Sequence, residues 1–267
     1  MVDEVSARRR WSEEETILAL YLYFQLPFGK LHSGNPEIQQ LAAALGRSNS
    51  SVAMKLVNFA SLDPIIIASG RKGLDGASKL DRALYAQFGQ DWSGLVLRAE
   101  SMWESKIKPA TPLRLHENKS EFRFEPFQGE SVTQALVAQR IGQGFFRRAV
   151  LANYDGICCI TGIADPRLLI ASHIKPWGVD VENRHNPANG VLLSATFDKA
   201  FDRGLITIGA DRRVLVSREL RQSPSSETRT YFENYEDAQV RAAVRFEPDL
   251  AFLDWHNRNC FVDRREA

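Results

Sequence analysis

The sequence predicts an α+β protein with a mainly helical N-terminal half and a C-terminal half in which two strands precede a helix. Apolar residues in the N-terminal half recur at helical spacing, whereas residues 167–203 have the pattern of a strand, a loop, a second strand and a helix. Between the halves, residues 106–130 contain three prolines and little periodicity. We therefore expect a linker at 106–130 that joins domains at 1–105 and 131–267.

Capping residues followed by helically spaced apolar side chains predict the helices of the N-terminal half. They are expected at 12–25, at 35–46, from about Ser50 or Ser51 onward, at 78–88 and at 92–105. The second and third of these are short and are joined by a tight turn at Gly46, which is typical of a helix-turn-helix. Segment 65–76 is expected to form a short strand and a basic, glycine-rich loop.

The C-terminal half has a different pattern. Its expected elements are a helix at 142–153, strands at 167–174 and 190–193 separated by the loop 175–188, a helix at 195–203, a hairpin that turns near 210–211, and helices at 236–245 and 248–257.

Three residues in this half have a spacing that points to chemistry. His173 ends the first strand, Asn189 precedes the second strand, and Asp198 follows nine positions later on the helix. His173 lies within the block SHIKPW and Asn189 begins the block NGVLL, and Asp198 stands just before a third block, FDRGLI. With these blocks in this order, the sequence resembles the HNH endonucleases, whose ββα-metal motif places such residues around one divalent cation.

The resemblance implies a role for each residue. His173 would be the general base, because a neutral imidazole can take a proton from water at neutral pH. Asn189 would fasten the loop and orient the histidine, and Asp198 would bind the metal. Asp202, one helical turn further, is either a second ligand or a partner of Arg203. Carboxylate ligands favour Mg²⁺ or Mn²⁺ as the cofactor.

The sequence departs from this family in two places. Many relatives carry an acidic metal ligand just before the first histidine, where this chain has Ser172. A serine is a weak ligand, so Asp202, water or a DNA phosphate would have to complete the metal shell. Many relatives also have two CxxC pairs that bind zinc. Here the corresponding segments are Cys159–Gly162 and Ser194–Phe197, so we expect no structural zinc.

Further residues are expected to contact double-stranded DNA. In the C-terminal half these are Arg140, Gln143 and Arg147, whose helix face either holds a phosphate or is merely solvated, and Lys175. In the N-terminal half we expect a winged-helix-like, DNA-reading module, with a small protein-contacting helical domain as the alternative. Its contacts would be Ser50, Ser51, Lys55 and Asn58, exposed on the second helix of the motif, and Arg71 and Lys72 in the wing. His185, by contrast, is expected to be surface-exposed rather than catalytic.

These features predict a metal-dependent DNA endonuclease of the restriction type, with modification-dependent cutting included. The alternatives are a homing or phage-type nicking enzyme, and a DNA-binding regulator with a degenerate nuclease half. The net charge of +1 requires a DNA-binding protein to gather its cations on one surface. Without a long apolar run or a secretory signal, we expect a cytoplasmic location and no membrane partner. A monomer and a homodimer both remain open.

Overall fold

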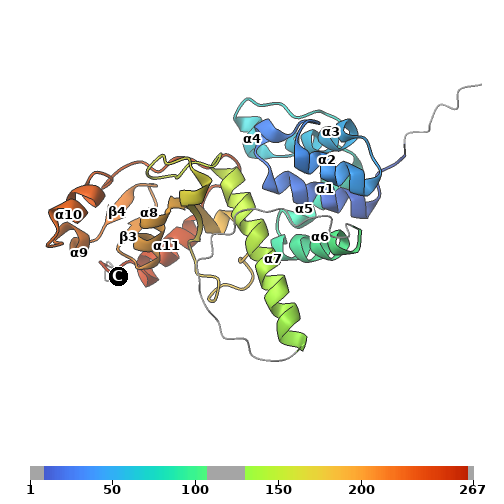
Figure 1. Cartoon of the computed structure of the whole chain (residues 1–267). Helices are drawn as coiled ribbons and strands as arrows, with labels where there is room; N and C mark the ends of the chain where they lie inside the picture. Colours follow the sequence, from blue (N-terminus) through green and yellow to red (C-terminus); the bar gives the residue numbers. More distant parts are fainter. Residues whose placement is uncertain (1–8, 107–129, 264–267) are drawn as a thin grey trace, which may run out of the picture. The chain divides into compact units, whose positions relative to one another are not determined.

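The structure, a computed structural model, describes residues 9–106 and 130–263, with side chains for 9–103 and 142–263. The chain divides into two compact units. The first contains α1 up to Tyr23 and helices α2 to α6, and the second contains Phe24–Pro27, α7 and everything after it (Figure 1). The predicted α+β class is confirmed, whereas the predicted linker at 106–130 lies almost wholly outside the described residues.

The described part of the N-terminal unit is helical. Its elements are α1 (Glu13–Gln25), the 3₁₀ turn η1 (Phe28–Lys30), α2 (Pro36–Leu45), α3 (Asn49–Ala60), α4 (Pro64–Ala68), α5 (Lys79–Phe88) and α6 (Trp92–Lys106). These bounds confirm the helices predicted from the capping signals.

The turn between α2 and α3 follows from its capping residues. Gly46 ends α2 with φ 59°, a left-handed conformation that favours glycine. Ser48 begins α3 by accepting a hydrogen bond from the Ser51 N–H. The two helices pack against each other through their apolar faces, which include Leu41 and Leu56, both fully buried.

The strand predicted within 65–76 is wrong. Asp63 accepts hydrogen bonds from the Ile65 and Ile66 N–H groups, and Pro64 occupies the first helical position. This cap outweighs the strand preference of three consecutive isoleucines, so residues 64–68 form a helical turn. The described N-terminal residues therefore contain no strand that could belong to a wing.

The C-terminal unit contains two antiparallel hairpins and several helices. Its elements are α7 (Glu130–Asn153), the 3₁₀ turn η2 (Pro166–Leu168), β1 (Leu169–His173), the 3₁₀ turn η3 (Pro187–Asn189), β2 (Gly190–Ser194), α8 (Ala195–Asp202), β3 (Ile206–Ile208), β4 (Val214–Val216), α9 (Arg218–Arg221), α10 (Ser226–Glu233) and α11 (Leu250–Asn259). The predicted strands and the helix that follows them are confirmed.

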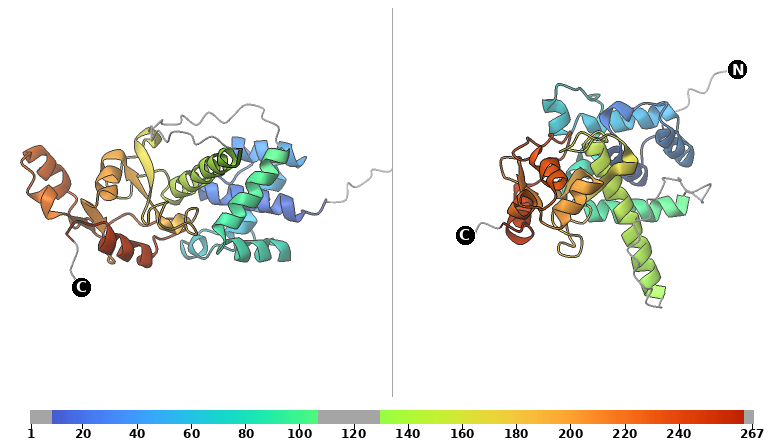
Figure 2. Two further views of the ribbon diagram at one scale, coloured as in Figure 1. Left: turned by 90° about the horizontal axis from the view of Figure 1, so that it is seen from below. Right: turned by 60° about the vertical axis from the view of Figure 1, so that its left-hand side comes forward.

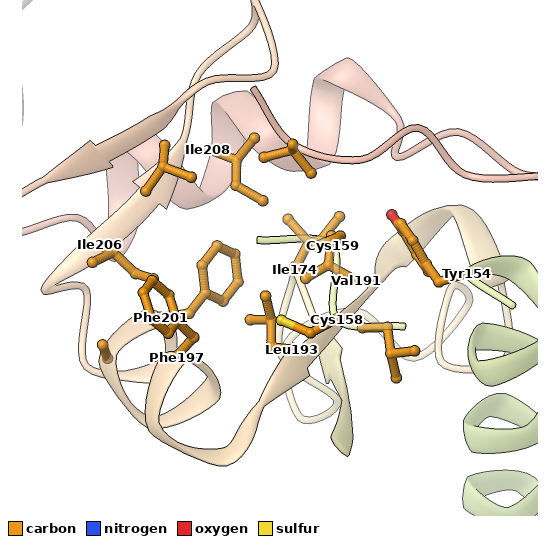
Figure 3. Packing of buried hydrophobic residues seen from close by; sticks show 14 of the residues in the cluster. Tyr154, Cys158, Cys159, Ile174, Val191, Leu193, Phe197, Phe201, Ile206 and Ile208 are labelled. Atoms are coloured by element: carbon orange, nitrogen blue, oxygen red, sulfur yellow. The ribbon is translucent and has the colours of Figure 1, made fainter. Parts of the chain in front are cut away.

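Helices α7 and α8 both pack on the β1–β2 hairpin, and α8 lies beside these strands in both views of Figure 2. The core between the elements is apolar and continuous. Figure 3 shows Phe197 and Phe201 of α8 together with Leu193 of β2 and the sulfur of Cys158. The hydrophobic burial in this core fixes where α8 lies relative to the hairpin.

The helix predicted at 236–245 is wrong. Residues in this segment pair instead with the second hairpin, where the Val240 N–H donates to Arg212 O (2.9 Å) and the Val214 N–H donates to Ala238 O (3.1 Å). Val240 and Ala243 are buried, so their spacing serves an extended segment beside β4 rather than a helix face. The helix nearby is α10, which begins after the cap Ser225 and was not predicted.

The packing of α7 on the hairpin depends on the first residue of β2. A Cβ added at Gly190 would lie 2.6 Å from Val150 Cγ2 and 2.8 Å from Phe146 Cζ. Only a residue without a side chain lets the helix approach β2 this closely. On α7 itself, Gly144 has no atom within 4 Å of an added Cβ.

These two glycines give a matched test of the packing. Gly190→Ala is expected to lower the free energy of unfolding of the C-terminal unit by about 1–3 kcal/mol, because the methyl group overpacks the interface. Gly144→Ala is expected to raise it by about 0.5–1 kcal/mol, because alanine favours a helix interior. Urea denaturation of both variants measures the difference. Equal effects of the two substitutions would contradict the close packing at β2.

Candidate active site

The β1–β2 hairpin brings the predicted residues to one end of the unit. In its register His173 pairs with Gly190, and Asn189 directly precedes β2. The loop between the strands therefore starts beside the histidine and returns to the asparagine. α8 follows β2 without a break and carries Asp198 and Asp202 along the hairpin.

Three groups fix the His173 ring. Its Nε2 lies 3.0 Å from Arg184 O, its face stacks on Phe146 (centroids 3.6 Å apart, planes at 11°), and Trp177 meets it edge-on at 5.4 Å. A carbonyl can only accept, so Nε2 carries the proton and Nδ1 is the free acceptor. Burial lowers the pKa of His173 to about 4, so the ring is neutral at physiological pH. The imidazole can thus take a proton at Nδ1.

Asn189 is fully buried and uses its amide to fasten the loop. Its Oδ1 accepts from the Lys175 N–H (2.8 Å), and its Nδ2 donates to Lys175 O (3.1 Å) and Asn183 O (3.3 Å). Its own carbonyl accepts from the Ile174 N–H (3.0 Å). These bonds hold both sides of the loop, which agrees with the role that the resemblance implies.

A second network holds the loop from within. Asp180 accepts from the Asn183 side chain (3.1 Å) and pairs with Lys175 Nζ (2.9 Å). These partners keep the pKa of Asp180 below its usual value although burial opposes them. Lys175, which we expected to contact DNA, is thus engaged by a carboxylate of its own loop.

The face of α8 carries two carboxylates one turn apart. Asp198 is half-buried, and its pKa is raised to about 6 by burial and by the charge of Asp202, against the opposing effects of Ser172 and Lys199. The pKa of Asp202 is also raised, although the residue itself is exposed. The raised pKa values mean that keeping both carboxylates ionised costs free energy. A cation bound between them would offset this cost.

Ser172 contributes a hydroxyl to the same place. Its Oγ is buried without a regular hydrogen-bond partner and lies beside Asp198. A buried hydroxyl oxygen beside the Asp198 carboxylate is chemically suited to a hard cation such as Mg²⁺ or Mn²⁺. Within the described residues no group of three or more His, Cys, Asp or Glu side chains is arranged for a metal, so water or phosphate oxygens would complete the shell.

The segments that correspond to the CxxC pairs are joined through a thiol. Cys158 Sγ accepts hydrogen bonds from the Thr161 N–H (3.3 Å) and the Ser194 N–H (3.2 Å). Both Cys158 and Cys159 are buried and free. A sulfur and apolar packing therefore link the turn at 158–162 to the start of α8. That the protein carries no structural zinc stays a prediction.

The predicted phosphate-binding face of α7 is only partly described. Arg147 donates to Leu169 O (2.9 Å) and Pro166 O (3.1 Å), so it braces the start of β1. Burial lowers the pKa of this guanidinium. Gln143 is exposed on α7, and the side chain of Arg140 lies outside the described residues.

His185 was expected on the surface, which is wrong. The ring is partly buried, meets Trp177 edge-on at 5.5 Å, and lies where a Cβ on Gly142 would be 2.1 Å from its Nε2. Sequence reasoning also missed Phe146, Trp177 and Arg184, which surround the base. Trp177 stands four residues after His173 in SHIKPW, and this was the one available signal.

In the N-terminal unit, Ser51, Lys55 and Asn58 were expected to be exposed, and the structure differs at all three. Ser51 and Asn58 are partly buried, whereas Ser50 is exposed as expected. Lys55 is 6% exposed, and its Nζ pairs with Asp81 Oδ1 at 2.7 Å, so the expectation that it is exposed is wrong. The Lys55–Asp81 pair instead links α3 to α5. Arg71 and Lys72 are exposed.

A cavity of about 1100 Å³ opens beside α3. Ser50, Ser51 and Asn58 line it. Its other lining residues are Arg9, Arg10, Trp11, Gly46, Arg47, Ser48, Met54, Lys55, Leu74, Asp75, Gly76 and Ser78. Arg9 and Arg47 both pair with Glu15, whereas Arg10 is exposed and has no ion pair within the described residues. The cavity thus combines hydroxyls, an amide and one uncommitted guanidinium.

A hairpin that carries a neutral histidine is followed directly by a helix that carries two carboxylates, which is the order of elements that the sequence resemblance implies. Comparison with protein families agrees, because the HNH endonuclease family model matches residues 158–209, a range that contains His173, Asn189 and Asp198. This segment is an HNH endonuclease domain, and such a domain implies the hydrolysis of phosphodiesters. The family generally uses a divalent metal and acts on DNA. No curated protein matches the chain.

One negative observation concerns membranes. None of the described helices combines the length and the apolar character needed to cross a bilayer.

Stability measurements can test the carboxylate pair without an activity assay. The folded-state pKa of Asp198 (about 6) lies above its ordinary value of 3.8, so its ionisation destabilises the metal-free protein as the pH rises through 6. In EDTA at pH 8, Asp198→Asn is therefore expected to raise the free energy of unfolding by about 1 kcal/mol, since solvent screens the partly exposed group. At pH 4 the gain should disappear.

Added Mn²⁺ should raise the unfolding midpoint of the wild type and have little effect on Asp198→Asn. The control is Asp254→Asn, which removes an exposed carboxylate that pairs with Arg258 on α11. The same response to Mn²⁺ in the wild type and in Asp198→Asn would contradict a cation site at Asp198.

Proposed function

We propose that this protein is a metal-dependent DNA endonuclease in which His173 is the general base and Asn189 is the residue that holds its loop. The observation that carries the proposal is the state of His173: a neutral ring, fixed through Nε2–H to Arg184 O, with Nδ1 free to accept a proton. Hydrolysis of a phosphodiester requires such a base, which removes a proton from the attacking water.

The carboxylates of Asp198 and Asp202, with the Ser172 hydroxyl, would hold Mg²⁺ or Mn²⁺. When bound, the cation would stabilise negative charge on the phosphate and the leaving oxygen. Phe146 and Trp177 cover two sides of the His173 ring, so the base keeps its orientation while a proton moves to Nδ1. Because its pKa is low, the imidazole is unprotonated at Nδ1 at neutral pH, and its fixed geometry keeps that nitrogen in one orientation.

For the N-terminal unit we propose DNA reading by a helix-turn-helix of α2 and α3. Support comes from the cavity beside α3, where the exposed Ser50 and the partly buried Ser51 and Asn58 offer hydrogen-bonding groups suited to base edges and phosphates. Arg10, Arg71 and Lys72 are exposed cations of the same unit. A chain that combines a DNA-recognition domain with a nuclease domain fits a restriction enzyme, including one that cuts only DNA with modified bases.

A second candidate follows from Ser172. Because this position lacks the carboxylate of many relatives, a DNA-binding regulator with an inactive nuclease domain remains the rival. The two differ in one measurable respect, which is metal-dependent cleavage of DNA.

The base is tested by His173→Ala. Cleavage of supercoiled plasmid with Mg²⁺ or Mn²⁺ is expected to fall by about 10² to 10⁴, the usual contribution of a general base. DNA binding in a filter assay should remain, because the ring is not a charged contact at neutral pH. Wild-type protein in excess EDTA should not cut. Near-normal cutting by the variant would remove His173 from the mechanism, and an inactive wild type would favour the regulator.

The N-terminal reader is tested on the full chain. Replacing Arg10, Arg71 and Lys72 together by alanine should weaken DNA binding and flatten its salt dependence by about 0.9 in log–log slope for each phosphate that is no longer neutralised. Ser51→Ala and Asn58→Ala should instead change which sequences or modifications are cut. Arg98→Ala is the control, because Arg98 pairs with Glu13. Unchanged binding and selectivity in all these variants would indicate a protein-contact module.

A further inference from the structure

Arg184 is joined to the catalytic histidine through its backbone but uses its side chain for something else. Its carbonyl accepts the His173 Nε2–H at 3.0 Å. Its Nε donates to Trp177 O at 2.8 Å, and its guanidinium carbon lies 5.2 Å from the centroid of the Trp177 ring. These two contacts fix the plane of the guanidinium but use only one of its five N–H groups.

The indole of Trp177 connects this cation to the base. Trp177 contacts the His173 ring at 5.4 Å and the Arg184 guanidinium at 5.2 Å. A positive charge is thereby held one aromatic ring away from the imidazole that takes the proton. The pKa of the neighbouring His185 is lowered, first by burial and then by the Arg184 charge.

The other cations near the base are already engaged. Lys175 pairs with Asp180, and Arg147 donates to two backbone carbonyls. Arg184 has no ion pair within the described part of the chain, and its two terminal nitrogens have no hydrogen-bond partner there. A partly buried guanidinium held with its outer edge unused is suited to an external anion.

We propose that the Arg184 guanidinium binds a phosphate oxygen of the DNA strand that is cut, at the scissile phosphate or at the phosphate next to it. This assignment rests on the proposed endonuclease function. A planar fork can give two parallel N–H···O bonds to one phosphate, and Trp177 orients the fork before the substrate arrives. Arg184 would then place the phosphate against His173 and stabilise its negative charge.

The first experiment measures plasmid cleavage by Arg184→Ala and Arg184→Lys. The backbone carbonyl that anchors His173 remains in both variants, so a slower reaction reports on the side chain. Arg184→Ala is expected to cut about 10²-fold more slowly, as when one oriented donor to a reacting group is removed. Arg184→Lys keeps the charge but not the fork and should be intermediate. Arg221→Ala, which removes a guanidinium that pairs with Glu236, should cut normally.

The second experiment separates phosphate binding from a structural role. If Arg184 contacts a phosphate, the log–log salt slope of DNA binding should fall by about 0.9 in Arg184→Ala, with unchanged thermal unfolding of the variant. On a duplex whose cut position has been mapped, a neutral methylphosphonate is placed at each linkage beside that position. If it slows the wild type but not Arg184→Ala, the contact is the neighbouring phosphate. If the two effects add while the salt slope falls, the contact is the scissile phosphate.

Two results would overturn the assignment. One is cleavage by Arg184→Ala at the wild-type rate. The other is a slow Arg184→Ala variant whose salt slope is unchanged and whose defect adds to that of every methylphosphonate, because a merely structural residue behaves in this way. Failure of the endonuclease function itself would look different, since wild-type protein would then not cut and His173→Ala would change nothing.

Discussion

The candidate site depends on one buried amide. Asn189 has no exposed surface and satisfies its acceptor and both of its donors on the backbone of the loop that follows β1. An unsatisfied buried amide group costs about 1–3 kcal/mol, so these bonds also make any other loop conformation unfavourable. The loop they hold carries the Arg184 carbonyl, which sets the tautomer of His173. The tautomer of His173 thus depends on the loop that the Asn189 side chain holds in place.

A second constraint is the absence of a side chain at Gly190, which lies opposite His173 on the neighbouring strand. Gly190 pairs with His173, and its lack of a side chain admits Phe146 to the position where that ring stacks on the imidazole. The stacking and the desolvation it brings lower the pKa of His173, while similar desolvation raises the pKa of Asp198. Burial therefore keeps the histidine neutral and also makes the charged form of the Asp198 carboxylate less favourable.

The sequence predicted much of this, and the failures have physical causes. Helices with strong caps, such as α2 and α3, and the strands beside His173 and Asn189 were predicted because their signals are local. Segments 64–68 and 236–245 were not, because a capping aspartate overrode strand preference in one and pairing with β4 overrode apolar spacing in the other. Lys55 was misplaced for a related reason: only the fold brings Asp81 to its ammonium group.

The residues that sequence reasoning missed explain why a site is harder to predict than a fold. Phe146, Trp177 and Arg184 come from α7 and from the loop after β1, and none belongs to the spaced triad of His173, Asn189 and Asp198. The contact of Phe146 forms only when α7 packs on the hairpin, and the contacts of Trp177 and Arg184 form only when their loop folds back onto His173. In the proposed mechanism the triad supplies the base and a metal ligand, whereas Phe146, Trp177 and Arg184 would set the protonation of His173 and the affinity for a phosphate. Differences in activity among nucleases of this kind should therefore be sought in the residues around the histidine as much as in the triad itself.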